Sequence, residues 1–449
     1  MDTGIKRILG IAMAFVGLSV GAGFASGQEI LQFFVVFGVP GLWGAAAVAA
    51  AMCLIGLIIL QLGSYYQADG HNVVLDRVAH PITAKFMDLA VMLTIFSIGM
   101  VMFAGAGSNL NQQFGIPSWI GSVSLLVLVV VLGRFDVDKV SAVIGAITPF
   151  IIALIVAAAV YTFGHADGDR DVLDSAASTI QTTLPNALIG AGNYVGFSLM
   201  VVISMSIVIG GYYLSPRIAG IGGLLGGFTF GLLLVLSAVV LYLQVNHVKD
   251  ADMPMLSLVG DIHPWLGVAM SAAIYGMIFN SALGMFYALA SRLSSGKPEK
   301  FQRYFLGSVA VGFIASFLGF KTLVTYVYPI LGYVGVVLMV LLFINWIRDH
   351  ATITAEARSR ARMRDLVRLK LDPGQRFTAT DAKELGTRAE KSNIEDSALL
   401  ATVHEKVSEE LVADDSVEFD EETAARVLEE FQADLHDASA PGNQQAAKD

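Results

Sequence analysis

Three glycines and two polar side chains interrupt the first apolar segment of this chain. Residues 21–29 read Gly-Ala-Gly-Phe-Ala-Ser-Gly-Gln-Glu. Glycine weakens a helix interior, and a charged or polar side chain is costly to place in a lipid bilayer. Within the bilayer, a helix is interrupted only where its backbone is buried in protein or lines a water-filled cavity. The stretch therefore predicts a broken membrane helix whose free backbone groups bind a solute.

Two simpler interpretations of this stretch stay open. Gly17 and Gly21 form a GxxxG pair, so the glycines could instead serve close packing between helices. Lys6 and Arg7 precede an apolar run that ends in small residues, as in a secretory signal peptide cleaved near residues 23–25. The apolar run resumes at once and many more follow, which argues against cleavage.

The composition predicts a polytopic membrane protein. The chain has 449 residues, of which 55% are hydrophobic and 15% charged, and its net charge of −10 comes from acids concentrated near the C-terminus. The single cysteine excludes an intrachain disulfide. The sequence contains no GK[ST] phosphate loop and no HExxH motif, and its GxSxG string at residues 17–21 lies within an apolar span, so an ATP-driven pump or a hydrolase is not expected. Neither an organic cofactor nor a nucleic-acid partner is expected.

Apolar windows of about 20 residues predict ten membrane spans. The windows are 8–37, 42–66, 86–108, 117–133, 140–163, 185–213, 219–244, 265–291, 302–320 and 323–346. Lysine and arginine gather in the loops on the N-terminal side of these spans, which predicts both termini in the cytoplasm and a location in the cytoplasmic (inner) membrane.

The chain divides into two regions that differ in composition. Residues 1–347 would form the transmembrane domain, and residues 348–449 a cytoplasmic tail that is basic, then acidic, and helical or partly disordered. The basic strip at 358–370 is expected to lie against anionic lipid head groups.

The ten spans suggest an inverted repeat of five plus five, in which span six should also be interrupted. Residues 193–198 read Asn-Tyr-Val-Gly-Phe-Ser and lie near the middle of that overlong span. Polar side chains beside a glycine at this depth predict a second discontinuous helix. The alternative is an ordinary tilted helix whose polar groups are satisfied by neighbouring helices.

The string from Gly21 to Glu29, followed by Leu-Gln-Phe-Phe at 31–34, resembles the first span of the YkvI-type membrane proteins. That family is grouped with branched-chain amino acid permeases and other transporters of the LeuT fold, in the APC superfamily. The resemblance covers about residues 5–346 and is specific at span one. It is weaker at span six, where Ser198 stands at a position that would match asparagine in the family.

The resemblance implies an all-α LeuT fold and a solute site where spans one and six face each other. Free N–H groups at the break would bind the carboxylate of the solute. Carbonyls near Val20 and Gly196 would bind its amino group, and aromatic side chains would contact its apolar part. The implied substrate-binding residues are Gly21, Ala22, Gly23, Phe24, Ala25, Phe103, Asn193, Tyr194, Gly196, Phe197 and Ser198.

The resemblance also implies a sodium site between spans one and eight. Its oxygen ligands would come from Gly17, Val20, Met277, Asn280 and Ser281. Asn280 could equally make a hydrogen bond between helices. The core of span five contains no lysine, which would take the place of sodium in some proton-coupled relatives, and this favours sodium.

Gln28 and Glu29 are candidates for coupling or gating. Glu29 is the one acid placed well inside a predicted span. It could couple transport to protons or balance the charge of a cationic substrate, or it could simply reach toward the outer surface.

The sequence therefore predicts a secondary transporter that imports a small amino acid or related zwitterion by alternating access, with Na⁺ as the expected coupling ion. Its partners would be a small solute and the lipid bilayer, while the oligomeric state is open. Alternatives are a proton-coupled transporter or exporter that uses Glu29, and a membrane ligand sensor that signals through its tail.

Overall fold

The computed structural model describes residues 2–133, 147–165, 169–295, 297–372, 374–394 and 396–412, together with residues 417, 419, 420, 423 and 426. Every regular element within these residues is helical. The beginning of the predicted span 140–163 and most of the chain beyond residue 412 lie outside the described residues.

The first span is broken, as its glycines predicted. Helix α1 (Asp2–Ser19) ends before two non-helical residues, and α2 (Ala22–Ser26) and α3 (Gln28–Phe33) follow. A short 3₁₀ turn, η1 (Val35–Phe37), completes the segment. Between α2 and α3, Gly27 has a φ of +81°, a left-handed conformation that glycine adopts without steric cost. The span is therefore interrupted twice, at residues 20–21 and at Gly27.

Eight helices are long and apolar enough to cross a membrane among the described residues. They are α4 (Val39–Tyr66), α6 (Pro81–Phe114), α9 (Ile147–His165), α11 (Ala187–Tyr212), α12 (Pro216–Leu243), α15 (Pro264–Leu293), the segment Pro298–Leu318 that contains α16 (Phe301–Ala315), and α17 (Phe320–Leu371). The two other predicted spans correspond to the broken segment and to the shorter α7 (Ser118–Leu132). The protein is thus an all-helical membrane protein with about eight candidate spans.

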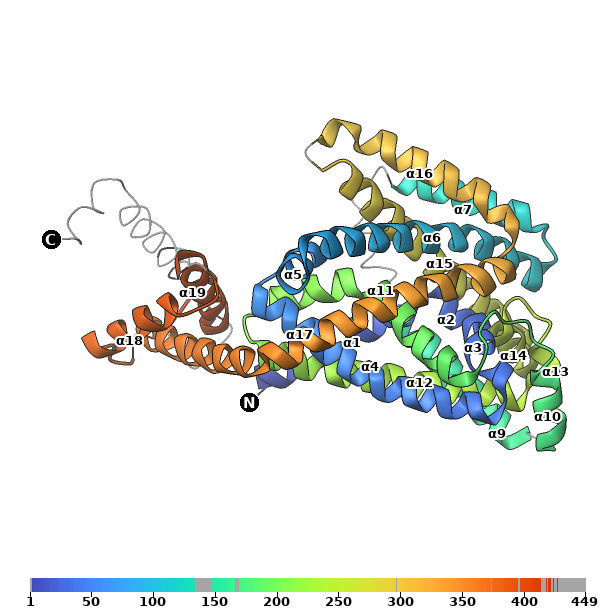
Figure 1. Ribbon diagram of the computed structural model, residues 1–449, viewed down its shortest axis with the longest axis horizontal. Coiled ribbons are helices and arrows are strands. Elements are labelled where there is room, and N and C mark those ends of the chain that lie inside the picture. The colour runs from blue at the N-terminus through green and yellow to red at the C-terminus, as the bar shows by residue number, and fades with distance from the viewer. Residues whose placement is uncertain are drawn as a thin grey trace.

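The long helices pack as two groups. Helices α1, α4, α11 and α12 lie together, and α6, α7, α15 and α16 form the second group (Figure 1). Helix α17 packs against members of both groups, and α9 against α12 and α15. Glycines permit the closest crossings, since a Cβ on Gly223 or Gly227 of α12 would meet the backbone of α4.

The predicted interruption of span six is wrong. Helix α11 runs without a break from Ala187 to Tyr212. Gly196 serves close packing instead, because a Cβ there would collide with the backbone of α17 at Gly332 and Gly335. The Asn193 side-chain amide donates to the Pro329 carbonyl at 2.9 Å, so this polar group is partly satisfied by the neighbouring helix.

Short helices connect the long ones outside the packed groups. They are α5 (His71–Val78), α10 (Arg170–Ala177), α13 (Val245–Val248) and α14 (Pro254–Ile262).

The tail continues α17, which extends without a break to Leu371. Helices α18 (Ala379–Glu390) and α19 (Asp396–Val412) pack around this extension through a small apolar core of their own. The N-terminus lies beside the tail (Figure 1). We therefore call this end of the molecule the tail side and the opposite end, near α10 and α13, the far side.

Three arginines of the basic strip contact protein groups, whereas the sequence predicted that the strip lies against lipid head groups. Arg360 is 2% exposed, and Arg362 and Arg364 pair with Glu384 and Glu410 of the tail helices. Arg362 and Arg364 therefore connect α17 with the other tail helices, and Arg360 reaches the carbonyls of Ser64 and Tyr65 at the end of α4.

Candidate solute and gate site

The broken first span lies in the interior of the helix assembly. Residues 22–36 are all buried, and they contact α11, α12, α14, α15 and α17. The predicted residues Ala22, Gly23, Phe24 and Ala25 belong to this buried stretch. Beside it, a Cβ added to Gly21 would meet no described atom within 4 Å, so the break borders open space.

The hydrogen-bonding groups at the break differ in part from the prediction. The N–H of Ala25 is not free, because it donates to the Gly21 carbonyl at 3.0 Å. The half-helix that begins here is only five residues long, since Gly27 interrupts it. The carbonyl of Gly196 is also no free acceptor at a helix break, because α11 is continuous. Free N–H groups at this break are thus confined to the residues before Ala25.

Glu29 turns back toward the break. Its side chain is buried and accepts a hydrogen bond from the Tyr194 hydroxyl at 2.9 Å. A Cβ on Gly23 would lie 2.5 Å from the Glu29 carboxylate and 3.3 Å from the Tyr328 hydroxyl. The structure therefore brings together the two predicted halves of the site, with Tyr328 of α17 as a residue that the sequence reasoning missed. A tyrosine directly before a proline in span ten was the available signal.

Aromatic rings surround this carboxylate. Tyr194 contacts Phe33 and Phe34 with ring centroids 5.2 and 4.9 Å apart. Phe197 stacks on Tyr328 at 4.3 Å. These five rings form an apolar layer shared by α3, α11 and α17, to which we refer as the aromatic layer. Ser198 is buried one helical turn after Tyr194.

Phe103 does not belong to the aromatic layer. It packs on Phe286 of α15 and Phe313 of α16, with centroid distances of 5.5 and 5.8 Å. Its side chain thus packs within the second helix group, and its role in the wall of the solute site stays a prediction.

Gln28 is buried with both polar atoms of its side-chain amide unpaired among the described residues. An unsatisfied buried polar group typically costs about 1–3 kcal/mol, which a bound solute or ordered water would recover. Gln28 is therefore a candidate ligand group at the broken span.

Hydrogen bonds close the far side of the site. The Gln32 amide donates to the Thr325 hydroxyl of α17. Two threonines of the segment before α11 complete the contact, with Thr182 donating to the Gln32 carbonyl at 3.1 Å and Thr183 to the Thr325 carbonyl at 3.0 Å. The Thr325 carbonyl has no donor within its own helix, because the residue four positions later is Pro329, which has no backbone N–H group.

Of the residues predicted for sodium, Gly17 lies on α1, Val20 directly follows it, and the other three lie on α15. The first described residues of α9 lie beside both helices. A Cβ on Gly17 would lie 4.0 Å from the Thr148 hydroxyl, and a Cβ on Gly276 would lie 2.7 Å from Ile147. The Asn280 side-chain oxygen is buried and has no partner among the described residues. Met277 is buried and Ser281 half-buried. Thr148 is an oxygen-bearing neighbour that the sequence reasoning missed.

A second polar network lies on the tail side. Asp88 of α6 accepts from Arg292 of α15 and lies 3.1 Å from the His71 ring of α5. The other ring nitrogen of His71 lies 3.0 Å from the Ser204 hydroxyl of α11. Burial lowers the pKa of His71, Arg292 lowers it further, and Asp88 opposes both effects. This network connects the two helix groups.

Comparison with known proteins agrees with this architecture. No protein-family model matches the chain. The chain is 24% identical over 330 residues to the uncharacterized membrane protein YkvI of Bacillus subtilis, covering 72% of this chain and 92% of YkvI. It is also 24% identical over 336 residues to the B. subtilis protein YyaD, covering 74% of this chain and 95% of YyaD.

Two solved transporter structures have a similar fold. The inward-facing conformation of Mhp1 matches with a TM-score of 0.57 at 12% identity, covering 94% of both chains. MhsT in complex with L-phenylalanine matches with a TM-score of 0.57 at 14% identity, covering 88% of this chain and 96% of MhsT. The chain is therefore a distant homologue of YkvI and YyaD and is structurally similar to secondary transporters of the LeuT fold.

Proposed function

We propose that this protein is a secondary transporter that imports a small amino acid or related zwitterion, driven by Na⁺, through alternating access. The observation that carries the proposal is the broken first span, which is buried against α11 and α17 and borders open space at Gly21. Gln28 offers an amide near this break that has no partner among the described residues, and Glu29 offers a buried carboxyl group. Such groups can orient a small polar solute within an apolar site.

In this proposal the protein has ten spans arranged as two inverted repeats, counting the broken segment and α7. The tail side faces the cytoplasm of the cell, because basic residues favour that side. Residues 1–347 are the transport domain and 348–449 the cytoplasmic tail. The far side then faces outward, and the bonds of Gln32 with Thr325 close the entrance.

Transport requires the two sides to open in turn. The aromatic layer and the Gln32 contacts must separate for solute to enter, while the network of His71, Asp88 and Arg292 stays closed. The order is reversed for release. The non-helical residues 20–21 allow α1 to move separately from α2 and α3.

The proposed cation site uses carbonyls of Gly17 and Val20 with oxygens of Met277, Asn280 and Ser281, and Thr148 is added as a neighbouring hydroxyl. Hard oxygen donors suit a cation such as Na⁺. A cation ligand would satisfy the Asn280 oxygen, which is otherwise buried without a partner among the described residues.

Thermal stabilisation of the purified protein tests solute and cation together. We expect one class of amino acid to raise the unfolding temperature in Na⁺ but not when choline replaces it, because a ligand stabilises the state that binds it. Ser281→Ala should abolish this shift. Ser291→Ala is the matched control, since Ser291 is an exposed serine on the same helix.

A different result would contradict sodium coupling and favour the proton-coupled alternative. In it, the ligand-induced shift in unfolding temperature would be the same with and without Na⁺, would vary with pH, and would disappear in Glu29→Gln. The buried contact of Glu29 with Tyr194 is the observation behind that alternative.

A further inference from the structure

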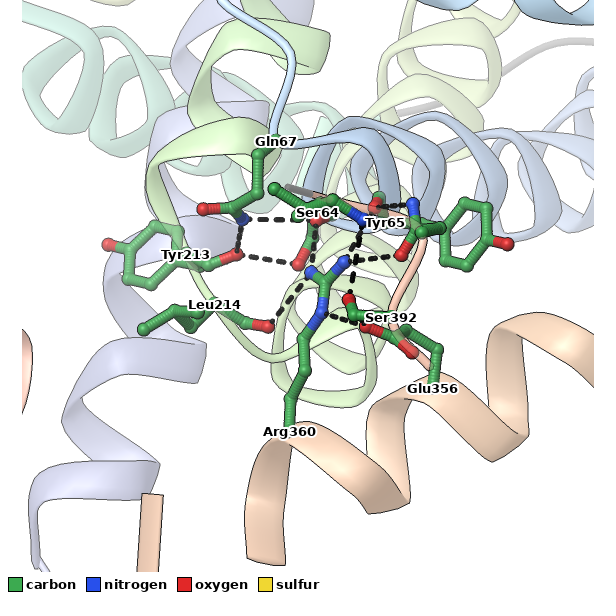
Figure 2. A network of polar contacts seen from close by, with 10 residues as sticks. Ser64, Tyr65, Gln67, Tyr213, Leu214, Glu356, Arg360 and Ser392 are labelled. Carbon is green, nitrogen blue, oxygen red and sulfur yellow. Dashed lines mark hydrogen bonds and ion pairs between the residues drawn. The ribbon is translucent and has the colours of Figure 1, made fainter. Parts of the chain in front are cut away.

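One arginine of the tail binds the ends of two membrane helices. Arg360 donates hydrogen bonds to the carbonyls of Ser64 and Tyr65, each at 2.8 Å, and to the carbonyl of Leu214 at 3.4 Å (Figure 2). Its guanidinium also donates to the Asn393 side chain at 2.8 Å. The first two carbonyls belong to the last turn of α4, and Leu214 lies two residues after the end of α11. Arg360 therefore joins the tail-side ends of α4 and α11.

The group of backbone carbonyls around Arg360 favours a positively charged side chain. The last carbonyls of a helix have no partner within the helix and carry partial negative charge, so a buried guanidinium satisfies them well. Glu356, one turn earlier on α17, pairs with Arg360 at 2.7 Å and also accepts from Ser392 at 2.6 Å. Asn393 adds a second bond to the Tyr65 carbonyl at 2.8 Å. The turn before α19 is thus fixed to the end of α4.

A second anchor joins the tail to α1. Glu410 of α19 accepts from Arg7 of α1 at 2.6 Å and from Arg364 of α17 at 2.9 Å. Its side chain is only 6% exposed, so this shared carboxylate is well shielded from water. Lys406 of the same helix lies 4.5 Å above the Tyr212 ring, at the end of α11.

Helix α1 is the part of the broken span that lies on the tail side. It is connected to α2 by two non-helical residues, and it packs on α12 where Gly222 and Gly226 let it approach closely. A helix with a hinge at one end moves as a unit unless its other end is held. Arg7 lies in the second turn of α1, far from the hinge, where a restraint has the greatest effect.

We infer that the folded tail is a latch that holds α1 against the ends of α4 and α11 and resists opening of the tail side. The latch acts within one helix group, because its anchors described above lie on α1, α4 and α11 together with α17. Release of Glu410 from Arg7 frees α1 while Arg360 keeps the tail attached.

Hydrogen–deuterium exchange of the full-length purified protein tests the latch without knowledge of the solute. Arg7→Gln and Glu410→Gln should each speed amide exchange in residues 8–19 by about tenfold, within the range typical of coupling between sites. Exchange in α12 should stay unchanged, which distinguishes release of α1 from general unfolding. The double variant should add little to either single change in α1, because each removes the same Arg7–Glu410 contact that holds this helix.

Arg362→Gln is the matched control. It removes an arginine of the same tail that pairs with Glu384 at 3.1 Å on an exposed surface. Its exchange in α1 should equal that of the wild type. Wild-type exchange in both Arg7→Gln and Glu410→Gln would overturn the inference, and so would equal acceleration of α1 and α12. Neither result would bear on whether the protein transports an amino acid.

Discussion

Among single residues, Glu29 and Tyr194 make the buried polar contact at the centre of the aromatic layer. Tyr194→Phe removes the hydroxyl that donates to a carboxyl group with little access to water. We expect destabilisation of about 1–3 kcal/mol, the usual cost of leaving a buried group unpaired, measured by thermal unfolding. Tyr275→Phe is the control, because it removes a partly exposed hydroxyl paired with Ser124 and should cost less. Equal losses in both variants would show that Glu29 gains nothing particular from Tyr194.

At the scale of elements, spans one and six show what local sequence can predict. Both contain glycines beside polar residues at mid-membrane depth, yet only span one is broken. In span one, Gly27 adopts a left-handed backbone conformation. Glycine adopts this conformation without steric cost, so the residue type itself indicates it. In span six, Gly196 instead lets α11 pack closely against the backbone of α17 at Gly332 and Gly335. Such long-range pairing leaves no local signal, and so the two cases look alike in the sequence.

This difference predicts opposite outcomes for two alanine substitutions in α11. Gly196→Ala places a Cβ 2.5 Å from the Val336 backbone nitrogen, so α11 and α17 must separate. We expect a loss of about 1–3 kcal/mol in the free energy of unfolding, as in other overpacked interiors. A Cβ at Gly192 meets no described atom within 4 Å, so Gly192→Ala should be neutral or stabilising, because alanine favours helix. A tolerated Gly196→Ala would argue against the close crossing of α11 and α17.

For the whole molecule, the sequence predicted the broken first span, which the structure shows, and the resemblance to LeuT-fold transporters, which the comparisons confirm. It did not predict how the tail docks. Arg360 stands in a run of arginines that also suits a lipid surface, and nothing near it in the chain indicates that it reaches Ser64 and Tyr65. The packing of Phe103 on Phe286 and Phe313 was not predicted for a related reason, because helix rotation is set by packing between helices.

The two helix groups are connected on the tail side through His71, and this connection predicts a pH dependence. Asp88 and Arg292 face the His71 ring from α6 and α15, Ser204 faces it from α11, and burial lowers its pKa below the ordinary value of 6.5. A released His71 would bind a proton near pH 6.5, whereas the closed network binds it only at lower pH. The closed network is therefore fully stable above about pH 6.5 and weakens as the pH falls below it, by at most about 1.4 kcal/mol per pH unit.

Hydrogen–deuterium exchange in α5 between pH 8 and pH 5.5, corrected for the intrinsic exchange rate, measures this weakening. Protection should fall below about pH 6.5 in the wild type, and His71→Gln should flatten the profile because the glutamine does not titrate there. His80→Gln, at an exposed position before α6, should leave the wild-type profile unchanged. A flat wild-type profile would mean that the proton on His71 has no part in joining the two groups, and that Asp88 and Arg292 close the tail side by themselves.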